Sequence, residues 1–231
     1  MTEPAGVYAT KSDYAYTRLR DGILTGEFEP GTVLHQATLA KTIGISTTPL
    51  REAMRRLMTE GLVELDAHRD ARVSALTAEE ARDLLEVRRS LDPLAASLAA
   101  QRRTKDDIRA MREAAASLHA LPNQPSVSDL VAHRRFHAAV YTASHNDILI
   151  TTLAGLWDKA DRYRHLGLQV ERDQPERDAK DREHAKLLDA VIRGDSDGAA
   201  EVMRQHIATS LGAKAASRLG ADEEPPHLTL S

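Results

Sequence analysis

Residues 38–63 read TLAKTIGISTTPLREAMRRLMTEGLV and decide the fold of the N-terminal part of the chain. The spacing of their apolar residues predicts a short helix, a turn at residues 44–46 and a second helix with an exposed basic face. Two helices joined by such a turn form a helix-turn-helix, whose second helix is shaped to enter the major groove of DNA.

The second helix has a start signal, a buried side and a polar side. Thr48 suits its N-cap and Pro49 its first helical position. The apolar stripe that follows consists of Leu50, Ala53, Met54, Leu57 and Met58. We therefore expect one face of this helix to pack on an N-terminal core while the other face stays in solvent.

The polar side of this helix supplies candidates for DNA contacts, namely Thr47, Thr48, Arg51 and Arg55. Arginine can bond a guanine edge with two donors at once, and threonine can contact a phosphate or a thymine methyl group. The alternative is a merely solvated basic face, on which Glu52 and Arg56 pair across one helical turn.

Two short strands are expected after this helix, at residues 63–65 and 72–74. The hairpin that they form is the wing of a winged helix-turn-helix. We expect His68 and Arg69, in the turn between the strands, to reach an adjacent groove of the DNA.

The composition is that of a mainly α protein without disulfides. Of 231 residues, 42% are apolar and 3% aromatic, and there is no cysteine, which favours helices and excludes thiolate metal sites. The net charge of −4 excludes a non-specific nucleic-acid coater but permits a local basic face. No basic-then-apolar leader and no apolar run near the ~20 residues of a membrane span occur, so we expect a cytoplasmic protein with no membrane partner.

From Thr77 onward the sequence favours helix. Helices are expected at about residues 78–101, 105–119, 127–143, 147–167, 176–193 and 197–215. Pro93 is expected to kink or break the first of them, because proline removes a backbone donor. The polar residues 216–231 are expected to be disordered. The predicted fold class is mainly α, with a winged helix-turn-helix at residues 10–76 and an all-α antiparallel helical bundle at residues 77–215.

The pattern in residues 38–63 resembles the DNA-binding domain of GntR-family bacterial repressors, which carry the same Leu-Ala…Gly-x-Ser-x-x-Pro-x-Arg-Glu-Ala…Leu…Glu-Gly-Leu order. The helical part resembles the FCD effector domain of the FadR-type branch of that family. The residues that carry this second resemblance are Asp83-Leu84-Leu85-Glu86-Val87-Arg88, Leu98-Ala99-Ala100, Phe136-His137, Asn146, Glu183-His184 and His206. Together the two resemblances cover about residues 10–215 and imply a dimeric, ligand-responsive regulator.

Three positions depart from the family pattern. Ala37 stands where the family commonly has an arginine that reads DNA, and Thr47 replaces a further arginine. Asp70 stands where the wing usually has a glycine, and aspartate tolerates a left-handed backbone better than most residues. The operator sequence therefore cannot be inferred from relatives.

Histidines carry the chemistry of the helical part. His133 and His137 are four residues apart, so they share one face of a helix. The resemblance implies a metal site, because FCD domains use an Asp-x-x-x-His pair and two later histidines, to which His137, His184 and His206 correspond. His133 replaces the aspartate, which predicts a four-histidine site that favours zinc or nickel as its divalent transition metal. Asp129, one turn earlier, is the alternative ligand.

The resemblance also implies an effector site beside the metal. Arg88 occupies the family position that lines this cavity, and arginine can hold a carboxylate with two donors. The alternative for Arg88 is an ion pair with Glu86 or Asp92. Arg135 and Arg162 are further candidates for the clamp. A small organic or sugar acid that fills open metal positions would then favour one dimer geometry over another.

We therefore expect a homodimeric transcription repressor, not an enzyme, that binds double-stranded operator DNA with one half-site per winged module. Two alternatives stay open. A metal sensor would use the same histidines with the ion itself as the signal. A metalloenzyme would need a general base, but Glu183 points about 100° away from His184 on a helix, and the chain has no His-Glu-x-x-His motif.

Overall fold

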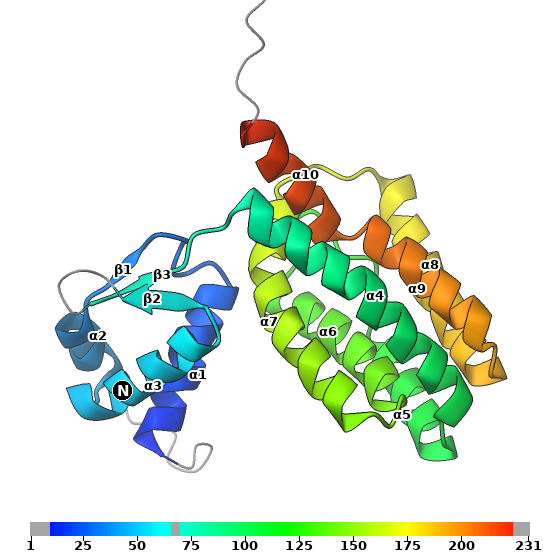
Figure 1. Cartoon of the computed structure of the whole chain (residues 1–231), viewed down its shortest axis with the longest axis horizontal. Helices are drawn as coiled ribbons and strands as arrows, with labels where there is room; N and C mark the ends of the chain where they lie inside the picture. Colours follow the sequence, from blue (N-terminus) through cyan, green and yellow to red (C-terminus); the bar gives the residue numbers. More distant parts are fainter. Residues whose placement is uncertain (1–9, 66–69, 224–231) are drawn as a thin grey trace, which may run out of the picture. The chain divides into compact units, whose positions relative to one another are not determined.

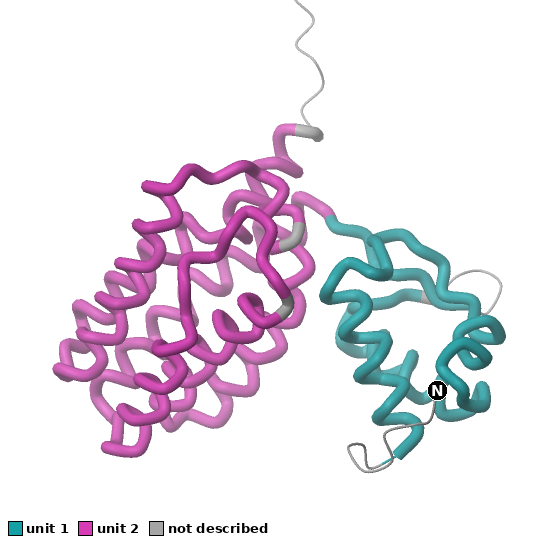
Figure 2. Tube along the Cα trace, turned by 180° about the vertical axis from the view of Figure 1, so that it is seen from behind, with its two compact units in different colours: residues 1–76 teal, residues 77–231 magenta. Residues whose placement is uncertain are grey.

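The structure is a computed structural model that describes residues 10–65 and 70–223. The chain forms two compact units, residues 1–76 and residues 77–231 (Figure 2). The elements of the N-terminal unit are α1 (Lys11–Leu24), β1 (Val33–Leu34), α2 (Gln36–Ile43), α3 (Thr47–Thr59), β2 (Val63–Leu65) and β3 (Ala71–Val73). Its strands form an antiparallel sheet in the order β1-β3-β2, beside the three helices (Figure 1).

The helix-turn-helix consists of α2 and α3. Gly44 ends α2 with φ 74°, a left-handed conformation that glycine adopts without steric cost. The N-cap of α3 is Ser46 rather than the predicted Thr48. Pro49 therefore lies inside the first turn, where its missing N–H is tolerated because first-turn donors have no helical partner.

The predicted apolar stripe of α3 faces the core of this unit. Leu50 and Leu57 are fully buried together with Leu19 of α1. Strand β1 was not predicted, because a two-residue strand is too short to show a period. It pairs Val33 with Arg72 of β3 and so closes the sheet on that core.

The described residues of the C-terminal unit form helices joined by loops, without a strand. Its helices are α4 (Ala78–Arg102), α5 (Lys105–Ala116), α6 (Val127–Thr142), α7 (Asp147–Leu168), α8 (Gln174–Arg193), α9 (Ser196–Ala208) and α10 (Leu211–Glu223). Helix α4 contacts α6, α7, α8, α9 and α10 (Figure 1). Phe136, Val140, Leu153 and Met203 lie fully buried among them. The predicted fold class, a winged helix-turn-helix followed by a helical bundle, is confirmed.

Of the kink or break that the sequence predicts at Pro93, the break does not occur. The helix continues through it to Arg102. A proline at this position removes the hydrogen bond to the carbonyl of Arg89, but Arg89 is exposed, so water can satisfy that carbonyl. Pro93 itself is buried in the bundle, and the packing of its ring offsets part of the lost bond.

The last predicted helix is divided in two, and helix continues beyond residue 215. Between α9 and α10, the Thr209 hydroxyl donates to the carbonyl of Gln205 at 3.0 Å, and the Ser210 hydroxyl accepts from the Ala213 N–H at 3.3 Å. These side-chain bonds compete with helical ones and favour a break. Residues 216–223, expected to be disordered, belong to α10, which packs on α4 and α7.

Leu153 of α7 should be critical for the bundle, because its side chain is fully buried. Leu153→Ala should lower the free energy of unfolding of this unit by about 2–5 kcal/mol, through lost burial and the cavity left behind. Ile148→Ala on the same helix is the matched control, since Ile148 is 81% exposed and its truncation should cost less than about 0.5 kcal/mol. Urea unfolding followed by fluorescence of Trp157, the single tryptophan, would measure both; equal losses would contradict this account.

Candidate metal centre and nucleic-acid interface

Helix α3 presents the predicted DNA contacts on its solvent side. Thr47, Arg51 and Arg55 recur at four-residue spacing and therefore share a face. Thr48 lies beside them, and all four side chains are exposed. Arg51 Nε donates to Gln36 Oε1 of α2 at 3.0 Å, which fixes the position of this arginine on the surface.

Arg56 plays a different part from the other arginines of α3. Its Nη1 donates to Asp13 Oδ1 at 2.8 Å, and its guanidinium lies 3.8 Å from the ring centroid of Tyr16. Arg56 therefore joins α3 to α1 instead of pairing with Glu52. The Arg55 guanidinium, by contrast, forms no ion pair within the described residues and is available to DNA.

Asp70, which stands where the wing usually has a glycine, caps a helix and has no left-handed backbone. Its carboxylate accepts from the Gln36 N–H at 3.1 Å and lies 2.8 Å from His35 Nδ1, at the N-terminus of α2. Among the described residues other than glycine, a positive φ occurs only at His145. Two predicted contacts lie outside the described residues: His68 and Arg69.

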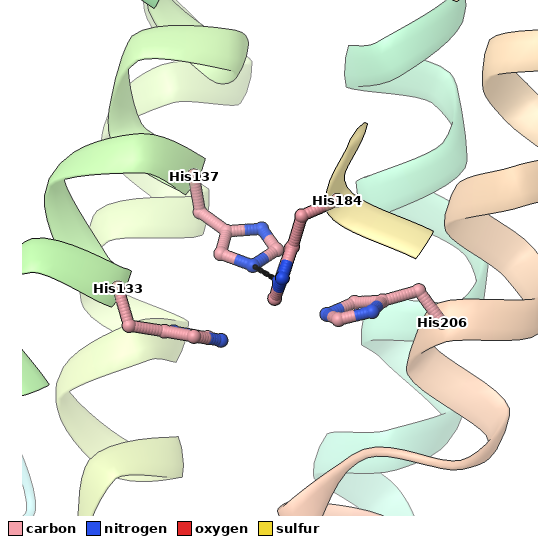
Figure 3. A group of neighbouring side chains, drawn as sticks. All are labelled: His133, His137, His184 and His206. Carbon is pink, nitrogen blue, oxygen red and sulfur yellow. Dashed lines mark hydrogen bonds between the residues drawn. The ribbon is translucent and has the colours of Figure 1, made fainter. Parts of the chain in front are cut away.

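The four predicted histidines converge inside the C-terminal unit. His133 and His137 come from α6, His184 from α8 and His206 from α9, and their rings point toward a common centre (Figure 3). One nitrogen from each ring lies within 4.8 Å of the other three, and all four residues are buried. Helix packing has thus gathered side chains that lie up to 73 residues apart in the sequence (206 − 133).

One pair of histidine nitrogens has the spacing of two ligands on a tetrahedral metal. His137 Nε2 and His184 Nε2 lie 3.3 Å apart. Ligand nitrogens bound to zinc at about 2.05 Å in a tetrahedron are separated by about 3.3 Å. The Nδ1 atoms of His133, His137 and His184 are buried without a hydrogen-bond partner. Because an unpaired buried polar atom costs about 1–3 kcal/mol, these rings need a ligand or ordered water.

Burial keeps the imidazoles in the protonation state that binds metals. It lowers the pKa of His133 and His137 well below the usual value, with the charge of Arg164 or of neighbouring histidines adding to it. The pKa of His184 is lowered to about 3, again mainly by burial. Neutral imidazole is the form that coordinates a cation, since protonation occupies the lone pair.

Glu183 orients the fourth histidine, a role that the sequence did not indicate. Its Oε2 lies 2.9 Å from His206 Nδ1, so that nitrogen donates and Nε2 is left for a metal. Burial raises the pKa of Glu183, but hydrogen bonds from His206 and Lys180 outweigh it and bring the pKa to about 2. A carboxylate already held by His206 and Lys180 is not a free general base, which argues against a metalloenzyme.

The alternative ligand, Asp129, is not among the four clustered residues. Its carboxylate accepts from the N–H of Ser126 at 2.8 Å and, in return, the Ser126 hydroxyl accepts from the Asp129 N–H. This reciprocal pair is a capping box at the start of α6. Helix capping therefore accounts for Asp129, and the metal-site candidate consists of histidines.

Arg88 lies beside the histidines in a buried ion pair. Its Nη2 donates to Asp92 Oδ2 at 2.7 Å, and the Tyr141 hydroxyl donates to the same oxygen at 2.7 Å. The guanidinium lies 4.8 Å from the Trp157 ring centroid. The attraction of Asp92 outweighs burial and raises the pKa of Arg88, so Arg88 keeps its charge and lines the cavity described next.

A cavity opens beside the cluster. His133, His184 and His206 line it together with Arg88. Of the further clamp candidates, Arg135 is exposed, and neither it nor Arg162 lines the cavity. The cationic residues that sequence reasoning missed here are Arg164, Arg172, Arg177, Lys180 and Lys214.

The winged helix-turn-helix and the helical bundle with its buried histidine cluster together define a two-domain DNA-binding protein. A family model described as "Bacterial regulatory proteins, gntR family" matches residues 11–73, and one described as "FCD domain" matches residues 83–209, more than half of the chain. The chain therefore belongs to the GntR family, with a C-terminal FCD domain as in its FadR-like members. It is a DNA-binding transcription regulator and not an enzyme.

Individual relatives agree with this assignment. The chain is 28% identical to the HTH-type transcriptional repressor GlaR of Escherichia coli strain K12 over 206 residues, which cover 85% of this chain and 92% of GlaR. It is 27% identical to the Glc operon transcriptional activator of the same strain, over 81% of this chain and 82% of the relative. The solved structure of E. coli McbR/YncC has a similar fold, with a TM-score of 0.75 at 20% identity over 94% of this chain and all of that one. Within the described residues, no helix combines the length and apolar character needed to cross a bilayer.

Removing Glu183 should weaken metal binding without removing a ligand. Glu183→Ala should lower the affinity for zinc about 10–100-fold, because His206 loses the acceptor that fixes its ring. Asp189→Ala is the control, since Asp189 lies on the same helix and is 64% exposed. Competition with a chromophoric chelator would measure both affinities. An unchanged zinc affinity in Glu183→Ala would show that His206 needs no orienting partner.

Proposed function

We propose that this protein is a homodimeric repressor whose operator affinity changes when a small carboxylate metabolite binds at a metal-containing cavity of the FCD domain. The observation that carries the proposal is the buried four-histidine cluster, which opens into a cavity beside Arg88. A cluster of neutral imidazoles without a carboxylate suits zinc or nickel better than magnesium or manganese. The bound metal would supply a positive centre and, with a coordination number above four, a fifth position for a carboxylate oxygen.

The protein's own residues would bind and orient the effector. His133, His184 and His206 would present the metal to the cavity, while His137, which does not line it, would bind from behind. Arg88 would attract the acid, with its orientation fixed by Asp92. A cation held by uncharged ligands next to an arginine favours an anion over a neutral molecule.

Operator recognition would use the exposed face of α3. Thr47, Thr48, Arg51 and Arg55 lie on it, and a helix of this kind places such residues against base edges and phosphates. Relatives include a repressor and an activator by name. We propose repression that the acid relieves, which is the usual arrangement in such families.

Helix α7 borders the cavity and also contacts the first residues of the C-terminal unit, so it could transmit a change from one to the other. It carries Trp157 and Arg164, which line the cavity, and Tyr163 between them in sequence. The Tyr163 hydroxyl donates to Glu80 Oε2 at 2.6 Å and accepts from the Thr77 N–H at 3.3 Å. Thr77 follows directly on the last residue of the DNA-binding unit, so a shift of α7 would act on the connection between the units.

The homodimer has a candidate surface on α4. Val87 and Leu94 are 44% and 46% exposed and lie two turns apart, so they share a face of that helix. Exposed apolar residues that share one helix face favour contact with a partner. A second copy is the partner that a pseudo-palindromic operator requires.

The protein purified without a His-tag or chelator should contain about one zinc or nickel per chain. His184→Ala should lose this metal, because a ligand nitrogen is removed, whereas His145→Ala should keep it, since His145 pairs with Asp107 elsewhere. Elemental analysis measures the content, and circular dichroism checks the fold of both variants. Absence of metal from wild type even after reconstitution would contradict the proposed centre.

Arg51→Ala and Arg55→Ala should each weaken binding to the operator by about 1–3 kcal/mol, through lost contacts to bases or phosphates. Arg109→Ala, an equal change of charge at an exposed position of α5, should have no such effect. Fluorescence anisotropy with the chain's own upstream DNA and a random duplex measures affinity and specificity. Equal binding of both duplexes by wild type would overturn the proposed function.

Tyr163→Phe should separate effector binding from its consequence. The hydroxyl does not line the cavity, so acid affinity should change less than about twofold, while the acid's effect on operator affinity should shrink by a large part of a typical 1–3 kcal/mol coupling. Calorimetry measures the first quantity and anisotropy the second. An undiminished acid response in Tyr163→Phe would exclude the route through α7.

Metal added without acid tests the metal-sensor alternative, which predicts a full response to the ion alone.

A further inference from the structure

The cavity beside the histidines has an excess of positive charge. Its charged lining residues other than histidine are Arg88, Arg164, Arg172, Arg177, Lys180, Lys214 and Glu176. Only one of these seven is acidic. A cavity with six cationic side chains and one carboxylate is electrostatically suited to an anion, and more so where burial weakens solvent screening.

Four of the cations are engaged by neighbouring groups. Lys180 pairs with Glu183 and Lys214 with Glu176. Arg88 pairs with Asp92. The two Nη atoms of Arg177 donate to the carbonyl of Arg172 and to the Gln174 side chain. These four side chains therefore shape the cavity without having all their donors free.

Arg164 has a donor without a partner. It is 6% exposed, and although Nη1 donates to Asp161 Oδ1 at 2.7 Å, Nη2 is buried without a hydrogen bond. Its guanidinium lies 5.4 Å from the Trp157 ring centroid, and the His133 ring lies 5.8 Å from the same ring. Arg164 thus lies on the wall of the cavity that also carries the histidine cluster.

Arg172 is the second such residue and comes from the segment between α7 and α8. It is also 6% exposed; Nη2 donates to the Pro122 carbonyl at 2.6 Å, while Nε is buried without a partner. Its backbone is fixed on both sides by Asn123, which accepts from its N–H and donates to its carbonyl. Burial lowers the pKa of Arg172, and the charges of Arg177 and Arg164 add to this effect.

Unpaired guanidinium donors in a buried wall are costly unless a ligand satisfies them. Carboxylate and phosphate oxygens match them in charge and geometry. Since the metal and Arg88 already provide for one carboxylate in the proposed function, the donors of Arg164 and Arg172 call for a second anionic group.

We propose that Arg164 and Arg172 form a second anion subsite, so that the effector is an acid with two anionic groups. This inference rests on the proposed function, which places the first carboxylate at the histidine cluster. The second group is a carboxylate or a phosphoryl group, both of which present anionic oxygens to arginine. A singly charged acid leaves this subsite unfilled.

Matched probes test the proposal on the full-length, zinc-reconstituted protein. Butanoate, succinate and 3-phosphonopropionate share a short chain and differ in the second end, which is a methyl, a carboxylate or a phosphonate group. Hexanoate and adipate repeat the comparison at greater length. Isothermal titration calorimetry measures each affinity without DNA, and zinc is assayed afterwards to exclude its removal by the acid.

We expect at least one dianionic probe to bind at least tenfold more tightly than its singly charged partner. Arg164→Gln and Arg172→Gln should each remove most of this advantage and leave the affinity of the singly charged acid within about twofold. Arg193→Gln, which makes the same change of charge at a position 62% exposed, should preserve the advantage. The ranking of succinate against 3-phosphonopropionate distinguishes a dicarboxylate from a phosphorylated acid.

Equal affinities for singly and doubly charged acids, or an advantage that survives both arginine substitutions, would overturn the second subsite while leaving the proposed function in place. If none of the acids binds, the second subsite and the carboxylate effector both fail. The proposed operator binding fails separately, in the anisotropy comparison of upstream and random DNA.

Discussion

Four imidazoles packed against one another in a helical interior impose the strongest constraint on this molecule. They come from α6, α8 and α9, so those helices must hold their relative positions for the cluster to exist. Protonation of the rings would place like charges close together. Burial lowers the pKa of His133 and His137, so these rings stay neutral. A cation held by all four rings would connect the packing of these helices directly to ligand binding.

Charged and polar side chains around the cluster hold its neighbours in fixed positions. Asp92 and Tyr141 fix Arg88, and Glu183 fixes His206, so the groups nearest the histidines are oriented before any ligand arrives. Such preorganisation lowers the cost of binding. The cavity wall also belongs to α7, whose Tyr163 contacts the first residues of the FCD domain. The same helix therefore both borders the cavity and contacts the segment that follows the DNA-binding unit.

The local sequence predicts only in part which arginines line the cavity. Arg88, which a family motif marks, lines the cavity together with three of the four histidines. Arg135 and Arg162 do not line it, whereas Arg164 and Arg172 do. Helix α10 packs on α7 and so determines which face of α7 borders the cavity. The local sequence does not predict that α10 begins at Leu211.

The sequence by itself determined the helix-turn-helix and the shared face of His133 and His137, because helical period and a glycine cap act over a few residues. It also identified the histidines that would meet, through the order of a family pattern. The capping box that occupies Asp129 is likewise local, since it joins two residues three apart. Only the tertiary structure decided that Glu183 of α8 holds His206 of α9, because this contact depends on side-chain directions and helix packing, which adjacent residues do not encode.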